Sequence, residues 1–81
     1  MPEVFRWRGF RFFFYSNEGK PVEPCHIHVE GADGEAKVWL EPEIRLASSA
    51  GLKSHDLLVI LNVVRERRDE IRERWDEYFG Q

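Results

Sequence analysis

Hydrophobic and polar residues alternate through the first half of the chain, and this alternation predicts β-strands. The stretch VFRWRGFRFFFY, residues 4–15, reads as two strands joined at Arg8-Gly9, because glycine supplies the positive φ that a two-residue hairpin turn needs. Both faces of its second strand are largely apolar, with Phe10, Phe12 and Phe14 on one and Arg11, Phe13 and Tyr15 on the other. We therefore expect a central strand that is covered on both sides.

A second hairpin is predicted from residues 25–30 and 35–40, around a loop of four residues at 31–34. The loop length fixes a register, in which Val29 pairs with Ala36 and Ile27 with Val38 on one face, and His28 pairs with Lys37 and His26 with Trp39 on the other. The apolar positions agree across the two strands, which supports this parity.

The second half of the chain changes from a period of two to the period of a helix. Pro42 ends the ladder, Ile44 and Leu46 form a short further strand, and residues 47–54 (ASSAGLKS) are expected to be a connection. Ser54 is the predicted N-cap of the helix. Asp56 lies in the predicted first turn, where a carboxylate stabilises the helix through its dipole.

One long helix is predicted from residue 55 to about 79, ending at Gly80. Its apolar stripe consists of Leu57, Leu61, Val64, Ile71, Trp75 and Tyr78. Arg68 occupies a position where the period predicts an apolar residue. The order of elements predicts an α+β fold: a small antiparallel sheet of four to five strands, in two hairpins, packed against a long C-terminal helix as one domain over residues 1–81.

Composition narrows the class of protein. With 81 residues, of which 42% are hydrophobic and 14% aromatic, the chain can build a small core and is not expected to be disordered. A single cysteine excludes an internal disulfide framework and a zinc site built on cysteines. No apolar run reaches membrane-spanning length and the first residues do not resemble a signal peptide, so we expect a cytoplasmic protein with no membrane association. The net charge of −3 does not suggest general attraction to nucleic acid.

Candidate chemistry lies in the segment HIHVE. His26, His28 and Glu30 alternate along a strand and should project together, with neighbours roughly 6 to 7 Å apart. Three interpretations remain open: a half-exposed structural face on which the histidines stack against Trp39, a site without metal, and a site for zinc, nickel or iron held by two histidines and the glutamate. No cofactor is predicted, and a divalent metal on His26, His28 and Glu30 is the minor alternative.

The site without metal gains support from the residues that face the histidines. Lys37 opposite His28, with Arg45 nearby, would form a cationic patch, and Trp39 would offer a stacking surface. This combination suits a phosphate beside a base, as in RNA, and His26 and His28 are candidate acid–base catalysts. The same groups would also suit an acidic peptide or a carboxylate.

Three further candidate residues lie outside the segment HIHVE. Arg68 either lies along the helix stripe with its head in solvent, or pairs with a buried carboxylate or completes a site. Cys25 is out of phase with His26 and should be a buried, inert thiol. His55 follows the helix cap and should be exposed.

Several stretches of the chain, taken together, resemble a known family: RFFFYSNEG, HIHVE, DGEAKVWL, RLASSAG and WDEYFG. They are similar to the bacterial family called domain of unknown function 4160, and the similarity runs from about Val4 to Gly80. The matching positions are His26, His28, Glu30, Asp33, Gly34, Glu35, Lys37, Trp39 and Arg45. The resemblance implies a small cytoplasmic bacterial protein, often encoded beside a second small protein in an arrangement like that of toxin–antitoxin pairs.

These observations lead to one functional hypothesis and two alternatives. The hypothesis is a toxin–antitoxin-like module whose His, Lys and Trp strand face contacts RNA or another phosphate-bearing target, with Glu30, Lys37, Trp39, Arg45 and Arg68 as candidate binding residues. Its expected partner is a small protein encoded nearby, a second copy of the chain, or both. The alternatives are a non-catalytic protein–protein interaction module and a small metal-binding protein; whether the chain is an enzyme is left open.

Overall fold

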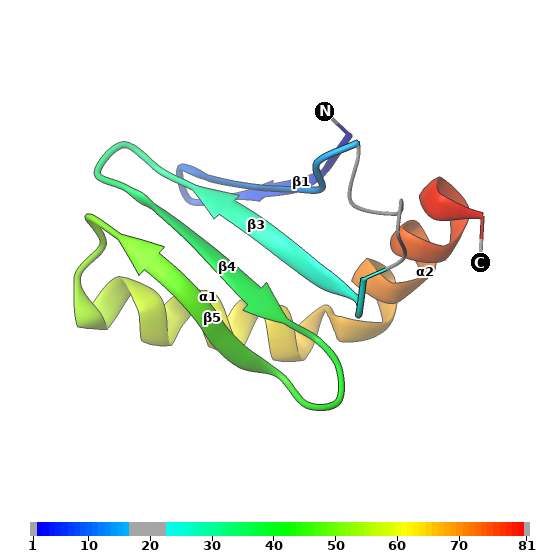
Figure 1. Ribbon diagram of the computed structural model, residues 1–81. Coiled ribbons are helices and arrows are strands. Elements are labelled where there is room, and N and C mark those ends of the chain that lie inside the picture. The colour runs from blue at the N-terminus through cyan, green and yellow to red at the C-terminus, as the bar shows by residue number, and fades with distance from the viewer. Residues whose placement is uncertain (1, 17–22, 81) are drawn as a thin grey trace.

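The computed structural model describes residues 2–16 and 23–80, as five strands followed by two helices (Figure 1). The elements are β1 (Glu3–Trp7), β2 (Phe10–Phe13), β3 (His26–Glu30), β4 (Glu35–Trp39), β5 (Arg45–Ala50), α1 (Ser54–Glu66) and α2 (Arg68–Phe79). All five strands belong to one antiparallel sheet in the order β1-β2-β3-β4-β5. The fold is therefore α+β, as the order of sequence patterns predicted.

The first hairpin turns at the predicted dipeptide. Arg8 and Gly9 have φ values of 46° and 83°, the pair of positive φ angles that a type I′ turn requires. The turn brings Trp7 opposite Phe10 and Arg6 opposite Arg11. The prediction of this hairpin is confirmed.

The second hairpin has the predicted register at every pair. His28 lies opposite Lys37 and His26 opposite Trp39, while the apolar pairs lie on the other face. The loop closes with a hydrogen bond of 2.9 Å that the Gly31 N–H donates to the Gly34 carbonyl. The alternation of the sequence was sufficient here because a slip of one residue would have exposed every apolar side chain.

The fifth strand is longer than the sequence pattern indicated. Residues 45–50 form β5, so the prediction that residues 47–54 are a connection is wrong for its first half. Alanine and serine carry no strong strand signal, and all six residues of β5 are exposed, so no burial pattern marks the strand in the sequence. Pairing with β4, interrupted by a bulge between Lys37 and Val38, determines its structure instead.

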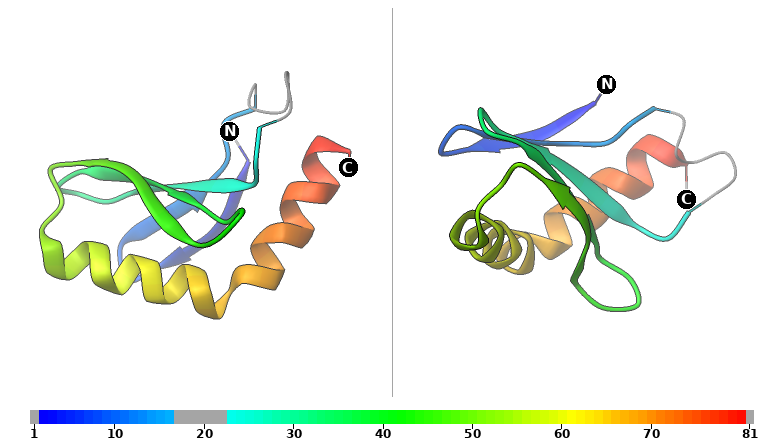
Figure 2. Two further views of the ribbon diagram at one scale, coloured as in Figure 1. Left: turned by 60° about the horizontal axis from the view of Figure 1, so that its bottom comes forward. Right: turned by 60° about the vertical axis from the view of Figure 1, so that its left-hand side comes forward.

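The single long helix of the prediction is two helices. The chain leaves helical geometry at Arg67, where φ is −108° and ψ is 21°. Arg68 begins α2 at the one position where the apolar stripe was interrupted, and the break lets α2 turn away from the axis of α1 and rise past the end of the sheet (Figure 2). Among the described residues, no helix combines the length and hydrophobicity that crossing a membrane requires.

The helix ends agree with the prediction only in part. Ser54 is the first helical residue rather than the cap; Lys53 holds the N-cap position without a side-chain hydrogen bond. Asp56 does lie in the first turn, as expected. Gly80 closes α2 in the left-handed conformation, and its N–H donates to the Asp76 carbonyl at 2.9 Å, which confirms the predicted helix end.

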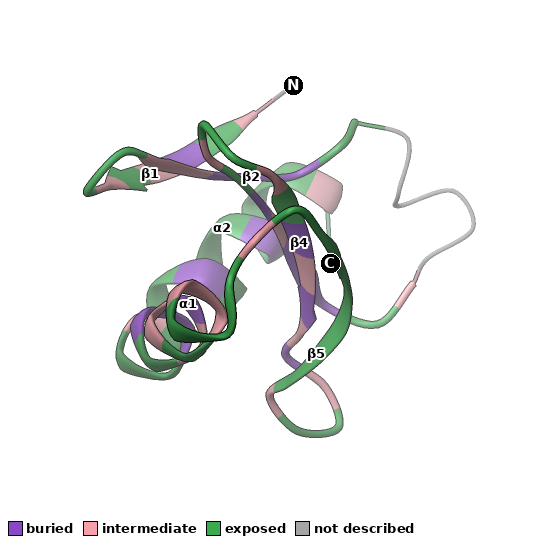
Figure 3. Cartoon of the chain, turned by 90° about the vertical axis from the view of Figure 1, so that its left-hand side faces the viewer, coloured by how far each residue is buried: buried purple, intermediate pink, exposed green. Residues whose placement is uncertain are grey.

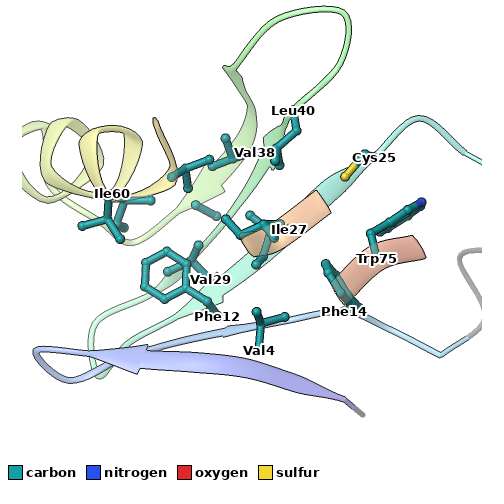
Figure 4. Close-up of a cluster of buried hydrophobic side chains, with 14 residues drawn as sticks. Val4, Phe12, Phe14, Cys25, Ile27, Val29, Val38, Leu40, Ile60 and Trp75 are labelled. Atoms are coloured by element: carbon teal, nitrogen blue, oxygen red, sulfur yellow. The ribbon is translucent and has the colours of Figure 1, made fainter. Parts of the chain in front are cut away.

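The core lies between the sheet and the two helices (Figure 4). Its fully buried members include Phe12, Phe14, Ile27, Val29, Val38, Ile60, Val64 and Ile71. Trp75 of α2 meets Phe14 edge to face, with ring centroids 5.2 Å apart. The predicted stripe is buried at Val64, Ile71 and Trp75, whereas Tyr78 at its end is 45% exposed.

α1 covers one side of the sheet, and we call the side turned away from α1 the outer face (Figure 2). Within the described residues, no helix covers β2 on the outer face, where we had expected cover on both sides. Phe13 is nevertheless only 2% exposed, because side chains cover it. The Arg11 guanidinium lies 4.3 Å from the centre of its ring, and the Tyr15 ring meets it edge to face at 5.2 Å.

Candidate functional site

The strand register assembles one row of side chains across the outer face. Phe13 of β2 lies opposite His28 of β3, His28 opposite Lys37 of β4, and Lys37 opposite Ser48 of β5. Directly opposed residues share a face of a sheet and have Cβ atoms about 5 Å apart. An imidazole, an ammonium group and a hydroxyl group are thus neighbours on the open side of the molecule.

A pocket of about 280 Å³ lies over this row, and we call it the outer pocket. It is lined by Tyr15, His28, Glu35, Ala36, Lys37, Ser48, Ser49 and Ala50. Sequence reasoning identified His28 and Lys37 but missed the other lining residues as members of a site. An unbroken register from Trp39 and Arg45 would have placed Ala47 opposite Lys37; the bulge between Lys37 and Val38 brings Ser48 there instead, and no pattern in the sequence marks that bulge.

His28 is held by aromatic neighbours on two sides. Its ring centroid lies 4.4 Å from that of Tyr15 and 5.7 Å from that of Phe13. These contacts restrict the imidazole while leaving it partly exposed in the wall of the outer pocket. A histidine in this position can reach a bound ligand.

Lys37 brings a positive charge to the opposite wall. Its Nζ atom lies 4.3 Å from the centre of the Trp39 ring, in a cation–π contact, and 3.6 Å from a carboxylate oxygen of Glu23. The side chain is only 24% exposed, so the ammonium group has a defined place rather than a wide range of rotamers. Trp39 is the stacking partner that the sequence predicted for His26, and it serves Lys37 as well.

His26 has a different environment from His28. It shares the outer face but is fully buried, with its ring centroid 5.0 Å from Trp75 and 5.3 Å from Trp39. Its Nδ1 atom lies 2.9 Å from the Pro24 carbonyl oxygen and bonds to it. Trp75 of α2 packs over His26, so this ring does not line the outer pocket with His28 as the sequence led us to expect. Its ring centroid lies 5.2 Å from that of His28.

Glu30 does not join the histidines. Its carboxylate lies 2.7 Å from Nη2 of Arg11, the residue directly opposite on β2. Within residues 2–16 and 23–80, no group of three or more His, Cys, Asp or Glu side chains is arranged to hold a metal ion. Glu30 and Arg11 therefore form a charged pair beside the outer pocket.

The two other candidate arginines occupy separate places. Arg45 lies at the start of β5, opposite Trp39, and is exposed on the rim of the outer face. Arg68 lies at the start of α2, where its side chain is 58% exposed and its Nε atom is 3.6 Å from Asp69. Arg68 lines a different pocket beside Glu41 and does not contribute to the outer pocket. Its head is in solvent, as the first of its two interpretations proposed.

Cys25 is a buried thiol, as predicted, with 4% exposure. Burial, and secondarily the charge of Glu41, raises the pKa of this thiol to about 12. The group is therefore uncharged near neutral pH and is a poor nucleophile. Its backbone N–H donates to Glu41 at 3.3 Å, and the other oxygen of Glu41 pairs with Arg72 of α2 at 2.7 Å. His55 is exposed, also as predicted.

A family model described as "Domain of unknown function (DUF4160)" matches residues 9–76 of the chain. The chain belongs to the DUF4160 family. No curated protein and no solved structure matches it. The DUF4160 match contains every residue that lines the outer pocket, whereas β1 and the last residues of α2 lie outside it.

Proposed function

We propose that this DUF4160 protein binds single-stranded RNA on the outer face of its sheet and acts with a second protein in a toxin–antitoxin-like pair. The observation that carries the RNA proposal is the row formed by His28, Lys37 and Ser48 in an open pocket, with Tyr15 at its rim. The pairing with a second protein is what resemblance to the family implies.

The chemistry of the outer pocket matches the parts of a ribonucleotide. Lys37, with Arg45 at the rim, offers positive charge to a phosphate. Tyr15 is 42% exposed and offers a ring to an unstacked base, the usual mode of sequence-tolerant recognition of single strands. Glu35 and Ser48 add an acceptor and a hydroxyl group that suit the 2′-hydroxyl of ribose.

Electrostatics limit how strongly this face can bind RNA. The whole chain has a net charge of −3, and Glu35 lies in the pocket wall beside Lys37. Attraction must therefore come from a few local cations, and affinity should depend on the ring contacts as well. We expect binding with a shallow dependence on salt, since each phosphate contact on a single strand contributes a slope of about 0.7 in the logarithm of affinity against that of salt.

The proposal is tested by fluorescence anisotropy with a labelled single-stranded RNA of about ten nucleotides. Lys37→Gln should weaken binding by about tenfold and reduce the salt dependence by about one phosphate contact. Arg65→Gln removes the same charge from the exposed surface of α1 and should leave binding unchanged. Equal loss in both variants, or no binding by the parent protein, contradicts the proposal.

A nuclease version of this function assigns acid–base catalysis to His28. Histidine is the side chain that exchanges protons most readily near neutral pH, and Lys37 on the neighbouring strand would stabilise charge on the phosphate. Purified protein is incubated with total RNA beside His28→Ala. Cleavage that disappears in the variant supports catalysis; cleavage equal in both, or none in either, refutes it while leaving RNA binding to the preceding experiment.

A further inference from the structure

The two edge strands of the sheet, β1 and β5, differ in how far other parts of the described chain contact them. At β1, Arg74 of α2 donates from Nη2 to the Glu3 carbonyl at 3.3 Å and from Nη1 to the Val4 carbonyl at 3.5 Å, and a bulge interrupts the strand. At β5, all six residues are exposed, and Figure 3 shows this strand exposed along its whole length beside β4. Within the described residues, β5 pairs with β4 and is the last strand of the sheet.

The backbone of β5 presents hydrogen-bonding groups to solvent at Ser49. The Leu40 N–H donates to the Cys25 carbonyl, and the Gly31 N–H donates to that of Gly34, which fixes the bonded pairs between β3 and β4. Bonded and non-bonded pairs alternate along an antiparallel ladder. Glu35 and Lys37 of β4 therefore bond toward β5, at Ala50 and Ser48. The N–H and C=O of Ser49, which lies between these two residues, point away from the sheet.

Exposed cations flank this edge strand. No acidic residue occurs from Ile44 to His55, although the chain holds 15 acidic residues, and the edge is flanked by Arg45 and Lys53, both exposed. The strand between these cations, Leu46 to Ala50, has no proline and no charged side chain, two of the devices that protect an edge from pairing, and its bulge lies at Ala47, before Ser48 to Ala50. It is open to a strand and attractive to negative charge.

We propose that the β5 edge binds an extended, acidic segment of a partner protein as a sixth strand, hydrogen-bonded through Ser49. A second copy of the chain is a poorer occupant, because antiparallel pairing of two β5 strands brings the Arg45 end of each toward the Lys53 end of the other. Adding a strand uses main-chain hydrogen bonds for affinity, and carboxylates beside the two cations select the segment.

The added strand would also affect the outer pocket. Ser48, Ser49 and Ala50 line the pocket from β5, so a sixth strand extends the pocket wall on that side. The inference rests on the part of the proposed function that gives the chain a protein partner, and it does not depend on RNA binding.

The test follows backbone amide signals by NMR during titration with a synthetic peptide. The probe is a peptide of about eight residues that alternates valine with glutamate, long enough to span β5 at about 3.3 Å per residue. Signals of residues 46–51 should move, and those of β1 should not, so that the Arg74-bound edge is an internal control. A peptide with lysine in place of glutamate should bind at least about tenfold more weakly.

Two variants at one position separate pairing from side-chain effects. Ser49→Pro removes the outward N–H and should abolish the shifts, whereas Ser49→Ala keeps the N–H and should preserve them. Circular dichroism confirms that both variants are folded. The peptide titration contains no RNA, so its result is scored independently of the RNA-binding experiment on Lys37→Gln. Absence of shifts at about 1 mM acidic peptide, equal binding of the lysine peptide, or a self-association that Ser49→Pro abolishes would each overturn the proposal.

Discussion

At the scale of single residues, His26 and His28 lie on the same strand face and yet have different roles. His26 is enclosed by Trp39 and Trp75, while His28 stands between Phe13 and Tyr15 at the edge of the outer pocket. The difference arises because α2 covers one end of β3 only. His26 is part of the packing that holds α2 in place, and His28 lines the outer pocket.

Replacing each histidine should separate these roles. His26→Ala leaves a cavity beneath Trp75 and should lower the free energy of unfolding by about 2 to 4 kcal/mol, a large part of the stability of so small a domain. His28→Ala should lower it by about 1 kcal/mol or less, because the ring is partly solvated. Urea denaturation monitored by tryptophan fluorescence measures both. Equal losses would contradict the difference in packing.

The thiol of Cys25 gives a second residue-scale prediction. Because burial raises its pKa to about 12, the group stays protonated and covered at pH values near 8. An aromatic disulfide reagent should therefore react only as fast as the protein unfolds, and the rate should rise with urea. Unfolded protein provides the reference for full reactivity. Rapid stoichiometric labelling of the native protein would show that the thiol is accessible.

From the sequence alone, only those features of the site that follow from strand alternation could be predicted. Alternation and loop length placed His26, His28, Lys37 and Trp39 on one face, because both are local properties of a hairpin. Burial of His26 depends on Trp75, which is remote in sequence and arrives only through the break between the helices. The pocket wall from β5 was missed for the same reason, since small exposed residues show no pattern of burial.

At the scale of elements, β5 is held by a close approach between two glycine-containing turns. A Cβ atom at Gly34 would collide with the Ala50 carbonyl and the backbone of Gly51, and Gly51 itself has a φ of 83°. These contacts fix the end of β5 against the loop between β3 and β4. The position of β5 is thus determined by this close backbone contact at Gly34 as well as by its pairing with β4.

Gly34→Ala should therefore destabilise the protein by about 2 kcal/mol, because backbone atoms cannot move aside as a side chain would. Gly9→Ala is the matched control: its Cβ would meet nothing within 4 Å, so only the positive φ should matter, at about 1 kcal/mol. Thermal denaturation of both variants provides the comparison. In hydrogen-exchange measurements, only Gly34→Ala should reduce protection of the β5 amides.

Element boundaries in the C-terminal half show where a periodic pattern stops being informative. The apolar residues before and after residue 67 fall on one stripe when this segment is treated as a continuous helix, so a single helix was the simplest interpretation. Packing favoured a break, since a straight helix would have carried Trp75 away from Phe14 and His26. The interruption at Arg68 was the one local sign of this break in the sequence.

At the scale of the whole molecule, the chain is compact and two-sided. Its radius of gyration is 11.8 Å, and compact domains of this length have values of about 12 Å. α1 closes one side of the sheet and Trp75 of α2 covers His26 at one end of the outer face, so the rest of that face is an open surface that carries aromatic and charged groups together. Glu41 links the residue before β3 to α2, because it accepts a hydrogen bond from the backbone N–H of Cys25 and pairs with the side chain of Arg72.

Because of these bonds to Glu41, the free energy of unfolding should depend on pH. The bonds from Arg72 and from the Cys25 N–H lower the pKa of Glu41 in the folded protein, so the folded state favours the ionised form. The stabilisation is present above the ordinary carboxyl pKa of about 4.3 and is lost as pH falls through the lower folded value. Since both side chains are exposed to water, Glu41→Gln should cost only about 0.5 kcal/mol at pH 7.

Urea denaturation at several pH values measures this dependence. The parent protein and Glu41→Gln should differ at pH 7 and converge once the pH falls below the lowered pKa of Glu41 in the folded protein, where the carboxyl group is protonated in both states. Glu73→Gln, an exposed change on the same helix, should show little such convergence. A constant difference across the range would mean that the charge of Glu41 is unimportant.

The guanidinium of Arg74 on the carbonyls of β1 has a consequence for aggregation. Endless growth of a β-fibre requires each subunit to offer two usable edges, one for the molecule before it and one for the molecule after it. Here one of the two is occupied by the protein's own C-terminal helix. Contact between neighbouring copies at β5 would accordingly end at a closed pair, and polymerisation would need α2 to detach first.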